Sequence, residues 1–450
     1  MVQIFRAPKG NSKKGNNQKQ HNPQKLQLNI EQLDHHGQGV CRQHQPLVFV
    51  DNALPGESVR VSISDKKSRF WKGRAIDILQ PSSQRIAPFC PYFSQCGGCQ
   101  NQHISAQDML AHKQSAVDAM LTKVAGTTAL NWQPAIYHDQ QAYRRKARLA
   151  IDNRDKQRLK VGFRAKLSNE VVAIEQCPVL TLPLQKLLPH LLAALHQLHN
   201  KNALGHVSLL DSGNQLQVTL RVIKEINEKD KLILANLESA SNCRVILETA
   251  KNQFEALSAS YQPAHYSLQD GIQIALSPND FIQVNAAVNQ QMVEQSIQWL
   301  ELDKQDRVLD LFCGVGNFSL PLANKVQQLI GIEGVAEMVQ QASDNAQRNE
   351  ISNSRFVQAD LTEWNMLNDD GIRHCNKVLL DPARAGALEV IAQLKALKPQ
   401  KILYVSCNPA TFARDMGELL SSGFRLDKIA LMDMFPHTVH TELMALFVPN

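Results

Sequence analysis

The chain has 450 residues, of which 43% are hydrophobic and 20% are charged, as in an ordinary globular protein of about two to four domains. It contains no run of about 18 apolar residues, so we expect no membrane-spanning helix and no membrane partner. The first 25 residues lack the apolar core of a signal peptide, which favours a cytoplasmic protein. In that reducing compartment, nine cysteines indicate metal binding or catalysis rather than disulfides.

Residues 1–25 form a basic tail rich in Asn and Gln. The first 30 residues contain no acid, and their six cations account for the formal net charge of +6, so the rest of the chain is neutral. These cations are Arg6, Lys9, Lys13, Lys14, Lys19 and Lys25. Two interpretations of the tail stay open: contact with phosphate groups, and a disordered, solvated terminus without a specific role.

Residues 26–84 are predicted to form a small β-barrel. Five short strands with alternating or apolar patterns are separated by turns that contain Gly or Pro, such as Pro55-Gly56. The expected strands are 26–30, one that follows the turn at 37–40, 47–51, 57–64 and 73–79. Barrels of this size bind nucleic acid or simply pack against a neighbour, and the pattern does not choose between the two.

Residues 85–271 are predicted to form a central domain of mixed helices and strands. Ser105 is placed as the N-cap of a helix over 106–124, and a leucine-rich helix is expected over 182–199. The expected strands are 146–151, 159–163, 171–174 and the hairpin 206–210 with 215–222. The run Tyr143-Arg144-Arg145-Lys146-Ala147-Arg148 concentrates four cations on a strand. Contact with an RNA backbone and a solvated basic face are both open for this run.

A cluster of cysteines lies at the start of this central segment. Cys90, Cys96 and Cys99 have the spacing C-x5-C-x2-C, and Cys177, followed by Pro178, is the best candidate for a fourth ligand. A structural zinc site usually has two CxxC pairs, whereas this chain has one, so an iron–sulfur cluster is favoured over zinc. Four lone cysteines are interpreted as packing residues. They are Cys41, Cys243, Cys313 and Cys375.

From residue 272 to 450, strands and helices alternate in the rhythm of a doubly wound parallel α/β sheet. The expected strands are 308–311, 328–332, 354–358, 377–380 and 401–406, with an amphipathic helix at 336–349. The carboxyl ends of such strands are where ligands bind, so the residues that follow each strand are the candidates for a site.

A glycine-rich turn, residues 310–318, follows the first of these strands. Gly314 and Gly316 let a ligand approach the backbone, but Ser319 stands where a dinucleotide fingerprint has its third glycine. Glu333 ends the second strand and can accept hydrogen bonds from ribose hydroxyls, and Asp360 ends the third, where it can meet an adenine edge. These features fit S-adenosylmethionine better than NAD. The alternative is a Rossmann-like sheet with solvated carboxylates at its strand ends.

Cys407 follows the fifth strand, and Asp381 ends the fourth. A thiol at this edge can act as a nucleophile, although most free cysteines are only small buried hydrophobes. Uracil C5 accepts a methyl group once a thiolate has added to C6, and a base must then remove the C5 proton. Cys407 suits the thiolate, whose ionisation we expect the cationic sulfonium and the backbone dipoles at the strand ends to favour, and Glu442 suits the base. His437 and His440 are interpreted as structural.

Four stretches together resemble the RNA uracil-C5 methyltransferases: DLFCGVGNF (310–318), LLDPAR (379–384), SCNPATFARD (406–415) and FPHTVHTE (435–442). The resemblance covers residue 26 to the end. It implies a TRAM domain, an OB-like barrel that binds RNA, at 26–84, with 54–57 as its signature. It makes Cys407 the nucleophile and Glu442 the base. It implies a 4Fe–4S cluster on Cys90, Cys96, Cys99 and Cys177. It places S-adenosylmethionine against Gln283, Phe312, Asn317, Glu333, Asp360 and Asp381.

The presence or absence of the cysteine cluster and of the barrel distinguishes the branches of this family. The tRNA enzyme lacks both the cysteine cluster and the barrel, and one 23S ribosomal RNA enzyme has the cluster without the barrel. A chain with both features resembles the other 23S branch, which implies methylation of one uridine in 23S ribosomal RNA, by a chain that we expect to be monomeric. The competing hypothesis is an RNA-binding iron–sulfur protein whose methyltransferase sheet is inactive.

Overall fold

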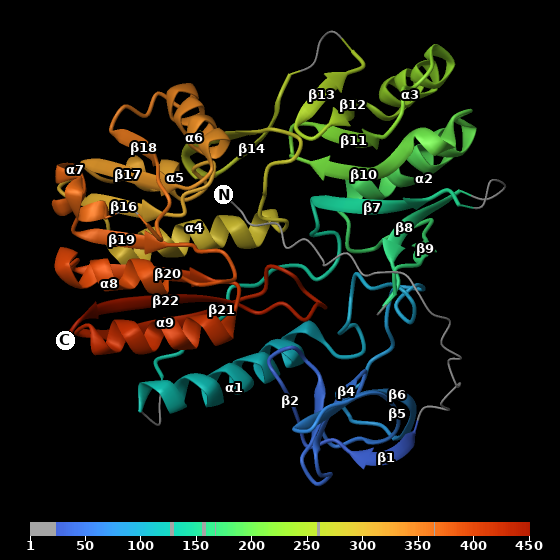
Figure 1. The fold of residues 1–450 in the computed structure, drawn as a ribbon, viewed down its shortest axis with the longest axis horizontal. Helices are drawn as coiled ribbons and strands as arrows, with labels where there is room; N and C mark the ends of the chain where they lie inside the picture. The colour runs from blue at the N-terminus through green and yellow to red at the C-terminus, as the bar shows by residue number, and fades with distance from the viewer. Residues whose placement is uncertain (1–23, 127–129, 155–158, 167, 259–261, 364) are drawn as a thin grey trace, which may run out of the picture. The chain divides into compact units, whose positions relative to one another are not determined.

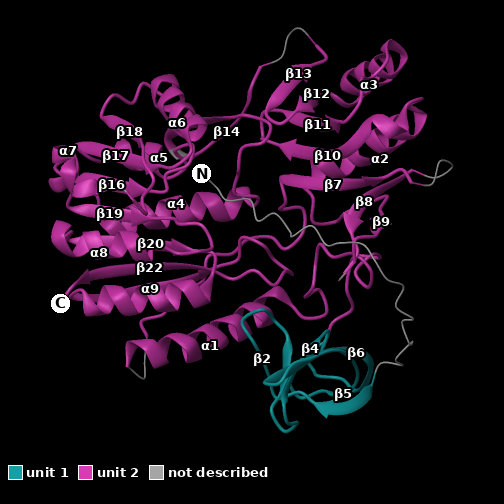
Figure 2. Cartoon of the chain, viewed as in Figure 1, with its two compact units in different colours: residues 1–85 teal, residues 86–450 magenta. Residues whose placement is uncertain are grey.

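The computed structural model describes residues 24–450 apart from 127–129, 155–158, 167, 259–261 and 364, so the predicted tail lies almost wholly outside the described residues (Figure 1). The chain divides into two compact units, Met1–Arg85 and Ile86–Asn450 (Figure 2). No further division falls near residue 271, where the sequence suggested the end of a central domain. Within the described ranges, no helix is long and apolar enough to cross a membrane.

The first unit contains a six-stranded sheet in its described part, residues 24–85, in the order β1-β5-β6-β4-β3-β2. The strands are β1 (Lys25–Asn29), β2 (Gln32–Leu33), β3 (Gly39–Cys41), β4 (Leu47–Asp51), β5 (Ser58–Lys66) and β6 (Phe70–Gln80). Val48, Val50, Val59 and Val61 are fully buried in a core of its own. The five predicted strands are confirmed, and β2 is an addition.

One turn of this unit is held by a buried ion pair. Glu57 is almost fully buried, and its carboxylate accepts hydrogen bonds from the Leu54 amide (2.8 Å) and from the Arg85 guanidinium (2.5 Å). A buried carboxylate needs such partners, because an unpaired charge in an apolar core is costly. The Leu54-Pro55-Gly56-Glu57 turn is therefore fixed by the arginine that ends the unit.

The first sheet of the second unit, which we call the central sheet, has the order β13-β12-β11-β10-β7-β8-β9 (Figure 1). Its strands are β7 (Lys146–Asp152), β8 (Lys160–Arg164), β9 (Val171–Ala173), β10 (Leu204–Asp211), β11 (Leu216–Val222), β12 (Cys243–Ala250) and β13 (Gln253–Ala256). The accompanying helices are α2 (Leu182–Gln197), α3 (Glu228–Ser241) and the short η1 (Lys201–Ala203). The predicted strands and the β10–β11 hairpin are confirmed, and α2 ends two residues earlier than expected.

Helix α1 (Ala106–Ala125) begins as predicted, because the Ser105 hydroxyl accepts a hydrogen bond from the Asp108 amide (3.0 Å). The helix packs on α9 (Pro409–Ser421) of the C-terminal sheet rather than on the central sheet. The segment that follows pairs with β21 (Phe424–Met432), an edge strand of that sheet, since the Gln133 amide donates to the Ile429 carbonyl (2.7 Å). Residues near the start of the predicted central domain therefore belong structurally to the C-terminal sheet.

The C-terminal sheet has the order β18-β17-β16-β19-β20-β22-β21. Its strands are β16 (Arg307–Leu311), β17 (Gln328–Glu333), β18 (Ser354–Gln358), β19 (Lys377–Leu380), β20 (Lys401–Ser406), β21 (Phe424–Met432) and β22 (Glu442–Pro449). The five predicted strands match β16 to β20 to within one residue. The expectation of a parallel sheet is wrong at β22, which runs antiparallel between β20 and β21 because it returns from β21 through a short loop.

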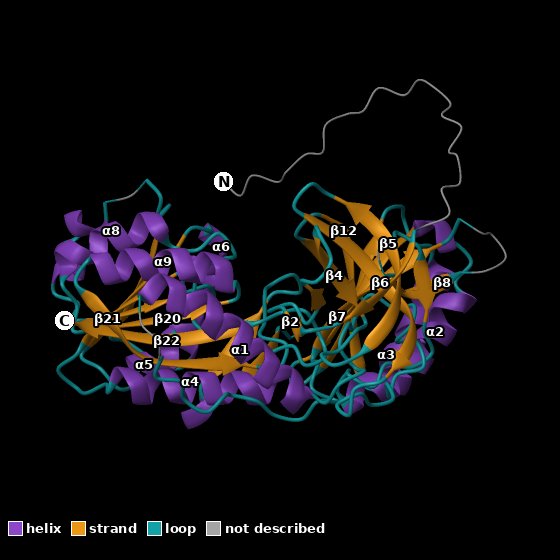
Figure 3. Ribbon diagram, turned by 90° about the horizontal axis from the view of Figure 1, so that it is seen from below, coloured by secondary structure: helices purple, strands orange, loops and turns teal. Residues whose placement is uncertain are grey.

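Helices cover both faces of this sheet, with α4 and α5 on one face and α8 and α9 on the other (Figure 3). Successive residues of β16 alternate between the two faces: Val308 joins the core that continues under the central sheet, and Leu309 joins the core under α8 and α9. The helices are α4 (Ala286–Leu300), α5 (Ser319–Ala323), α6 (Ala336–Arg348), α7 (Asp370–Arg373), α8 (Leu388–Leu397) and α9 (Pro409–Ser421). The remaining short elements are β14 (Ala264–Ser267), η2 (Gln269–Gly271), β15 (Gln273–Leu276) and η3 (Met366–Asn368).

Candidate active site

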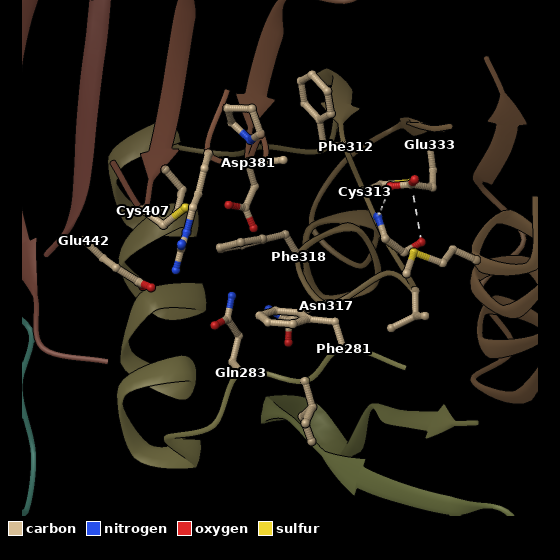
Figure 4. A pocket seen from close by; sticks show the side chains of 18 of the residues that line it. Phe281, Gln283, Phe312, Cys313, Asn317, Phe318, Glu333, Asp381, Cys407 and Glu442 are labelled. Carbon is tan, nitrogen blue, oxygen red and sulfur yellow. Dashed lines mark hydrogen bonds between the residues drawn. The ribbon is translucent and has the colours of Figure 1, made fainter. Parts of the chain in front are cut away.

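A pocket of about 460 Å³ lies at the carboxyl ends of β16, β17, β19 and β20, and we call it the strand-end pocket. It collects most of the predicted site residues. Those that line it are Gln283, Phe312, Asn317, Glu333, Asp381, Cys407 and Glu442. Figure 4 shows Cys407 and Glu442 on one side of the pocket and Glu333 on the opposite side, with Asp381 and Gln283 between them.

The glycine-rich turn forms the wall of the pocket beside Glu333. Gly314 and Gly316 have φ angles of 55° and 96°, which other residues rarely adopt, and Phe312 is strained at 68°. The Gly314 amide donates to one oxygen of the Glu333 carboxylate (3.2 Å), and the Val335 amide donates to the other (3.0 Å). These two bonds fix the carboxylate toward the pocket while leaving it able to accept further hydrogen bonds from a ligand.

Ser319, which departs from the dinucleotide fingerprint, has a partner inside the sheet. Its hydroxyl donates to the carboxylate of Asp310, which is almost fully buried at the end of β16. Burial raises the pKa of Asp310 to about 7, and the Ser319 bond opposes that rise. The serine therefore satisfies a buried acid beneath the glycine-rich turn.

Asn317 is held by side chains that sequence reasoning missed. The Tyr266 hydroxyl (2.8 Å) and the Asn289 amide (2.9 Å) both donate to its side-chain oxygen, and its own amide donates back to Asn289 (2.9 Å). Asn289 is almost fully buried in α4 among apolar neighbours. A polar residue in the apolar stripe of a helix was the available signal, because buried amides need partners.

Strand pairing brings Cys407 and Glu442 together. Ser406, the last residue of β20, lies opposite Leu443 of the antiparallel β22, so Cys407, which follows Ser406, and Glu442, which precedes Leu443, reach the same edge. Residues 35 positions apart in the chain are thereby placed side by side. The two groups also interact electrostatically, since Glu442 is one cause of the raised pKa of Cys407.

Burial and neighbouring acids favour the neutral forms of both groups. Burial raises the pKa of Glu442 to about 8, with Asp381 adding to the rise and Lys113 opposing it. Burial is the largest cause of the raised pKa of Cys407. The acids Glu442 and Asp381 add to this rise, while Arg384 opposes it. The backbone lowers the pKa of Cys407, in the direction we expected, but among the protein groups burial and two acids outweigh it.

Arg384 is a further pocket residue that sequence reasoning did not single out, although it ends the LLDPAR motif. Its carbonyl accepts hydrogen bonds from the side chains of Asn408 (3.1 Å) and Thr411 (3.2 Å). The residues just after Cys407 therefore fix the backbone that carries this cation into the pocket.

Two groups of predicted residues lie elsewhere. Asp360 is exposed, is not among the residues that line the strand-end pocket, and accepts hydrogen bonds from the amide (3.0 Å) and hydroxyl (2.7 Å) of Thr362.

The backbone carbonyl of buried His437 accepts hydrogen bonds from the backbone amides of Gln100 (2.8 Å) and Asn101 (2.9 Å), which agrees with a structural role. His437 connects the cysteine segment to the loop that leads to Glu442.

The four predicted ligand cysteines line a second cavity of about 350 Å³, the cysteine pocket. Burial, and next the neighbouring Cys177, raise the pKa of Cys99 to about 12. In the part of the chain that the structure describes, no group of three or more His, Cys, Asp or Glu side chains has the arrangement of a metal site. The lone cysteines Cys41, Cys243 and Cys375 are buried in the cores as predicted, whereas Cys313 also lines the strand-end pocket.

The basic run divides between the interior and the surface. Arg145 is buried, and its Nε donates to the Gln283 carbonyl (2.8 Å), while Lys146 Nζ is bonded to the carbonyls of Pro278 and Asp280. Arg148 is exposed and lines the cysteine pocket. Only part of this run is therefore a solvated basic face. Arg145 and Lys146 instead hold the segment that carries Gln283 through hydrogen bonds to its carbonyls.

The doubly wound sheet, the glycine-rich turn after β16 and the carboxylate that ends β17 define a Rossmann-like methyltransferase fold. A solved structure with this fold is the Pyrococcus abyssi tRNA (uracil-54, C5)-methyltransferase in complex with S-adenosyl-L-homocysteine. It has a TM-score of 0.71 and 23% identity, and the match covers 94% of this chain and all of that one.

Sequence comparisons identify the family. The tRNA (uracil-5-)-methyltransferase family model matches residues 105–448. A relative from Vibrio cholerae, named 23S rRNA (uracil(1939)-C(5))-methyltransferase RlmD, is 44% identical over 94% of this chain and 95% of its own. A relative of the same name from Shewanella piezotolerans is 42% identical over 99% of both chains. The chain belongs to the RNA uracil-C5 methyltransferase family and is an enzyme, which confirms the resemblance and removes the inactive-sheet alternative.

Proposed function

We propose that the protein transfers a methyl group from S-adenosylmethionine to C5 of one uridine in 23S ribosomal RNA. The observation that carries this proposal is the meeting of Cys407 and Glu442 in the pocket that the glycine-rich turn lines. The names of the relatives support 23S ribosomal RNA as the substrate. Such a substrate also agrees with the cytoplasmic location and the monomeric chain expected from the sequence.

The donor would bind on the Glu333 side of the pocket. The Glu333 carboxylate, fixed by two amides, can accept hydrogen bonds from the ribose hydroxyls, and Phe312 offers an apolar face. Gln283 and Asp381 lie toward the reacting side, and Asn317 holds the turn through Asn289 and Tyr266. When bound, S-adenosylmethionine supplies an electrophilic methyl group. Asp360 would meet the adenine edge only from outside the lining of this pocket.

The protein residues carry the remaining steps. Cys407 first releases its thiol proton to solvent; its thiolate Sγ then bonds to C6 of the uracil, and the electron pair of the C5–C6 double bond moves into an enolate that makes C5 nucleophilic. After C5 has accepted the methyl group, the Glu442 carboxylate takes the C5 proton. The electrons of the C5–H bond re-form the double bond, the C6–S bond breaks, and Cys407 leaves as a thiolate. The target base must leave its stack to reach this thiol.

The experiment is methyl transfer from labelled S-adenosylmethionine to a 23S ribosomal RNA fragment. Label in C5 of a single uridine is the expected result, and its absence with correctly folded protein contradicts the proposal. Replacing the target uridine by 5-fluorouridine, whose C5 has no removable proton, should trap a covalent complex. A complex that still forms with Cys407→Ala contradicts the assignment of the nucleophile.

The four cysteines of the cysteine pocket are proposed to hold a 4Fe–4S cluster. Their fit to this group is supported by convergence on one cavity, while Arg144 and Arg148 at its wall would offset the charge of bound thiolates. The ligands would be Cys90, Cys96, Cys99 and Cys177. Uracil methylation needs no electron transfer, so the proposed contribution of the cluster is to order the segment that contacts the loop before Glu442 and to help dock RNA.

The first unit is proposed to be a TRAM domain that contacts RNA, followed by the cysteine-bearing segment and the methyltransferase domain of residues 272–450. Support comes from its own core and from a surface with aromatic and basic side chains, such as Lys66 over the Trp71 ring at 4.4 Å. The measurement is RNA affinity of the full chain carrying Trp71→Ala. Affinity equal to that of the wild type contradicts a role for this surface.

A further inference from the structure

Helix α1 has a lysine in the stripe that it buries. The buried residues of this helix are Ala106, Met109, Lys113, Val117 and Leu121, which follow one another at helical spacing. Lys113 is 3% exposed, whereas Lys123 in the last turn of the same helix is exposed. Burying an ammonium group is costly unless it has strong partners, so the position calls for an explanation beyond packing.

The partners of Lys113 lie in the loop that leads to the base. Residues 433–441 form the β21–β22 loop, and Lys113 Nζ donates to two of its carbonyls, those of Thr438 (2.9 Å) and His440 (2.6 Å). Other carbonyls of the loop accept from neutral donors, for example that of Pro436 from the Tyr143 hydroxyl (3.3 Å). Lys113 therefore brings a charged donor to Thr438 and His440, which lie four and two residues before Glu442.

The same ammonium faces the acids around the base. Asp433 and Glu442 both favour its charged form and oppose the fall in the pKa of Lys113 that burial causes. In return, Lys113 opposes the rise in the pKa of Asp433 and of Glu442. The other charged or titratable groups facing Glu442 are Asp381, Arg384 and Cys407, and His437 also faces Lys113.

We propose that Lys113 is a positioning residue for the general base, holding the β21–β22 loop by two carbonyls and supplying the positive charge that lets Glu442 act as a carboxylate. This inference rests on the proposed methyl transfer. Lys113 touches loop carbonyls rather than the reacting atoms, so it acts through Glu442. Its role falls after the bond between Cys407 and uracil has formed, because Glu442 is needed only to remove the C5 proton.

The test is the pH dependence of the rate at which methylated RNA is released from Cys407 in a single turnover, for the wild type and for Lys113→Met, which removes the charge but keeps the length. Because Glu442 must be ionised to remove the C5 proton, the release rate rises with pH, and loss of the cation should move this rise about one pH unit higher. At pH 7 the variant should be about tenfold slower. Its complex with 5-fluorouridine RNA should form at the wild-type rate, since that step precedes the base.

Two variants serve as controls. Lys113→Arg keeps the charge and should keep the wild-type pH profile, and Lys123→Met makes the same substitution at an exposed position of α1 and should change nothing. If Lys113→Met does not fold, as judged by near-ultraviolet circular dichroism, the profile of Lys113→Gln decides instead. This second variant retains a hydrogen-bond donor but not the charge.

The outcomes separate the two proposals. Wild-type protein that methylates no uridine contradicts the proposed function itself. Wild-type methylation combined with an unshifted profile in a folded, uncharged Lys113 variant overturns only the inference. Slow formation of the 5-fluorouridine complex in that variant also overturns it, because the defect would then lie before the base acts.

Discussion

Two pockets of the larger unit contain thiols, and their surroundings differ. In the strand-end pocket, Cys407 lies beside Glu442 and Asp381, with Arg384 as a nearby cation, and the second thiol of the lining, Cys313, is buried in the glycine-rich turn. In the cysteine pocket, four thiols lie near one another, and the charged side chains at the wall include Arg144 and Arg148. A thiol next to a carboxyl group suits a bond that forms and breaks, whereas four thiols near cations suit permanent ligation of a metal.

The two pockets share one segment of chain. Residues Phe435, Thr438, Val439 and His440 of the β21–β22 loop line the cysteine pocket, and Glu442, at the end of the same loop, lines the strand-end pocket. A change in one pocket therefore has a direct structural route to the other, although we expect the chemistry of the two pockets to be separate.

The largest effect is expected for Cys407→Ala, which removes the proposed nucleophile. Methyl transfer to 23S ribosomal RNA should fall by about 10⁴-fold or more, and no covalent complex should form with 5-fluorouridine RNA. Binding of S-adenosylhomocysteine, measured by calorimetry, should stay within the wild-type range. The matched control is Cys375→Ala, a buried thiol remote from both pockets, which should retain activity if it folds.

Glu442→Gln should separate the two halves of the reaction within one pocket. Loss of the base is expected to lower turnover by about 10²- to 10⁴-fold. Because Cys407 can still add to C6, a covalent complex with unmodified RNA should accumulate and be visible on a denaturing gel. If turnover falls and no complex accumulates, Glu442 acts before the C5 proton is removed, contrary to its proposed role.

Cys99→Ser addresses the other pocket. The variant should lose bound iron and visible absorbance when purified without oxygen, and methyl transfer should fall by about tenfold through the shared loop. Affinity for S-adenosylhomocysteine should not change. Cys243→Ser is the control for a buried thiol outside the pocket and should keep its iron. Zinc in place of iron, or full iron content in Cys99→Ser, would contradict the cluster assignment.

The smallest effect concerns stability. Burial raises the pKa of Glu442 from 4.5 to about 8, so between these values the folded protein keeps a proton that the unfolded chain has released. Folding stability contributed by this group is therefore present below pH 4.5 and lost as pH rises toward 8. Glu442→Gln does not titrate, so its melting temperature relative to the wild type should increase between pH 5 and 8. The exposed Glu389→Gln should show no such trend.

Much of the C-terminal fold was predictable because its parallel strands are short, buried apolar runs bounded by turns. The positions of β16 to β20 followed from that pattern, but their spatial order did not, since pairing is a non-local property. Strands β21 and β22 were not predicted as elements, although the motif containing Glu442 was recognised. Without the antiparallel return of β22, the sequence offered no geometric reason for Glu442 to meet Cys407.

The candidate site was also predictable from the sequence only in part. Glu333, Asp381 and Cys407 follow strands directly, so their shared edge was predictable from the pattern. Asp360 also follows a strand. The chain turns after β18, however, and the amide and hydroxyl of Thr362 donate hydrogen bonds to the Asp360 carboxylate. Lys113 lies 329 residues before Glu442 and was detectable only as a lysine in an apolar helical stripe.

The position of β22 between β20 and β21 has a consequence for synthesis of the enzyme. A nascent chain translated as far as Met432 already contains the glycine-rich turn, Glu333 and Cys407, but not Glu442. Such a chain has the groups proposed to form the bond to uracil and none of the proposed means of releasing it. The proposed release step therefore becomes available only when β22 inserts between two strands that the ribosome made before it.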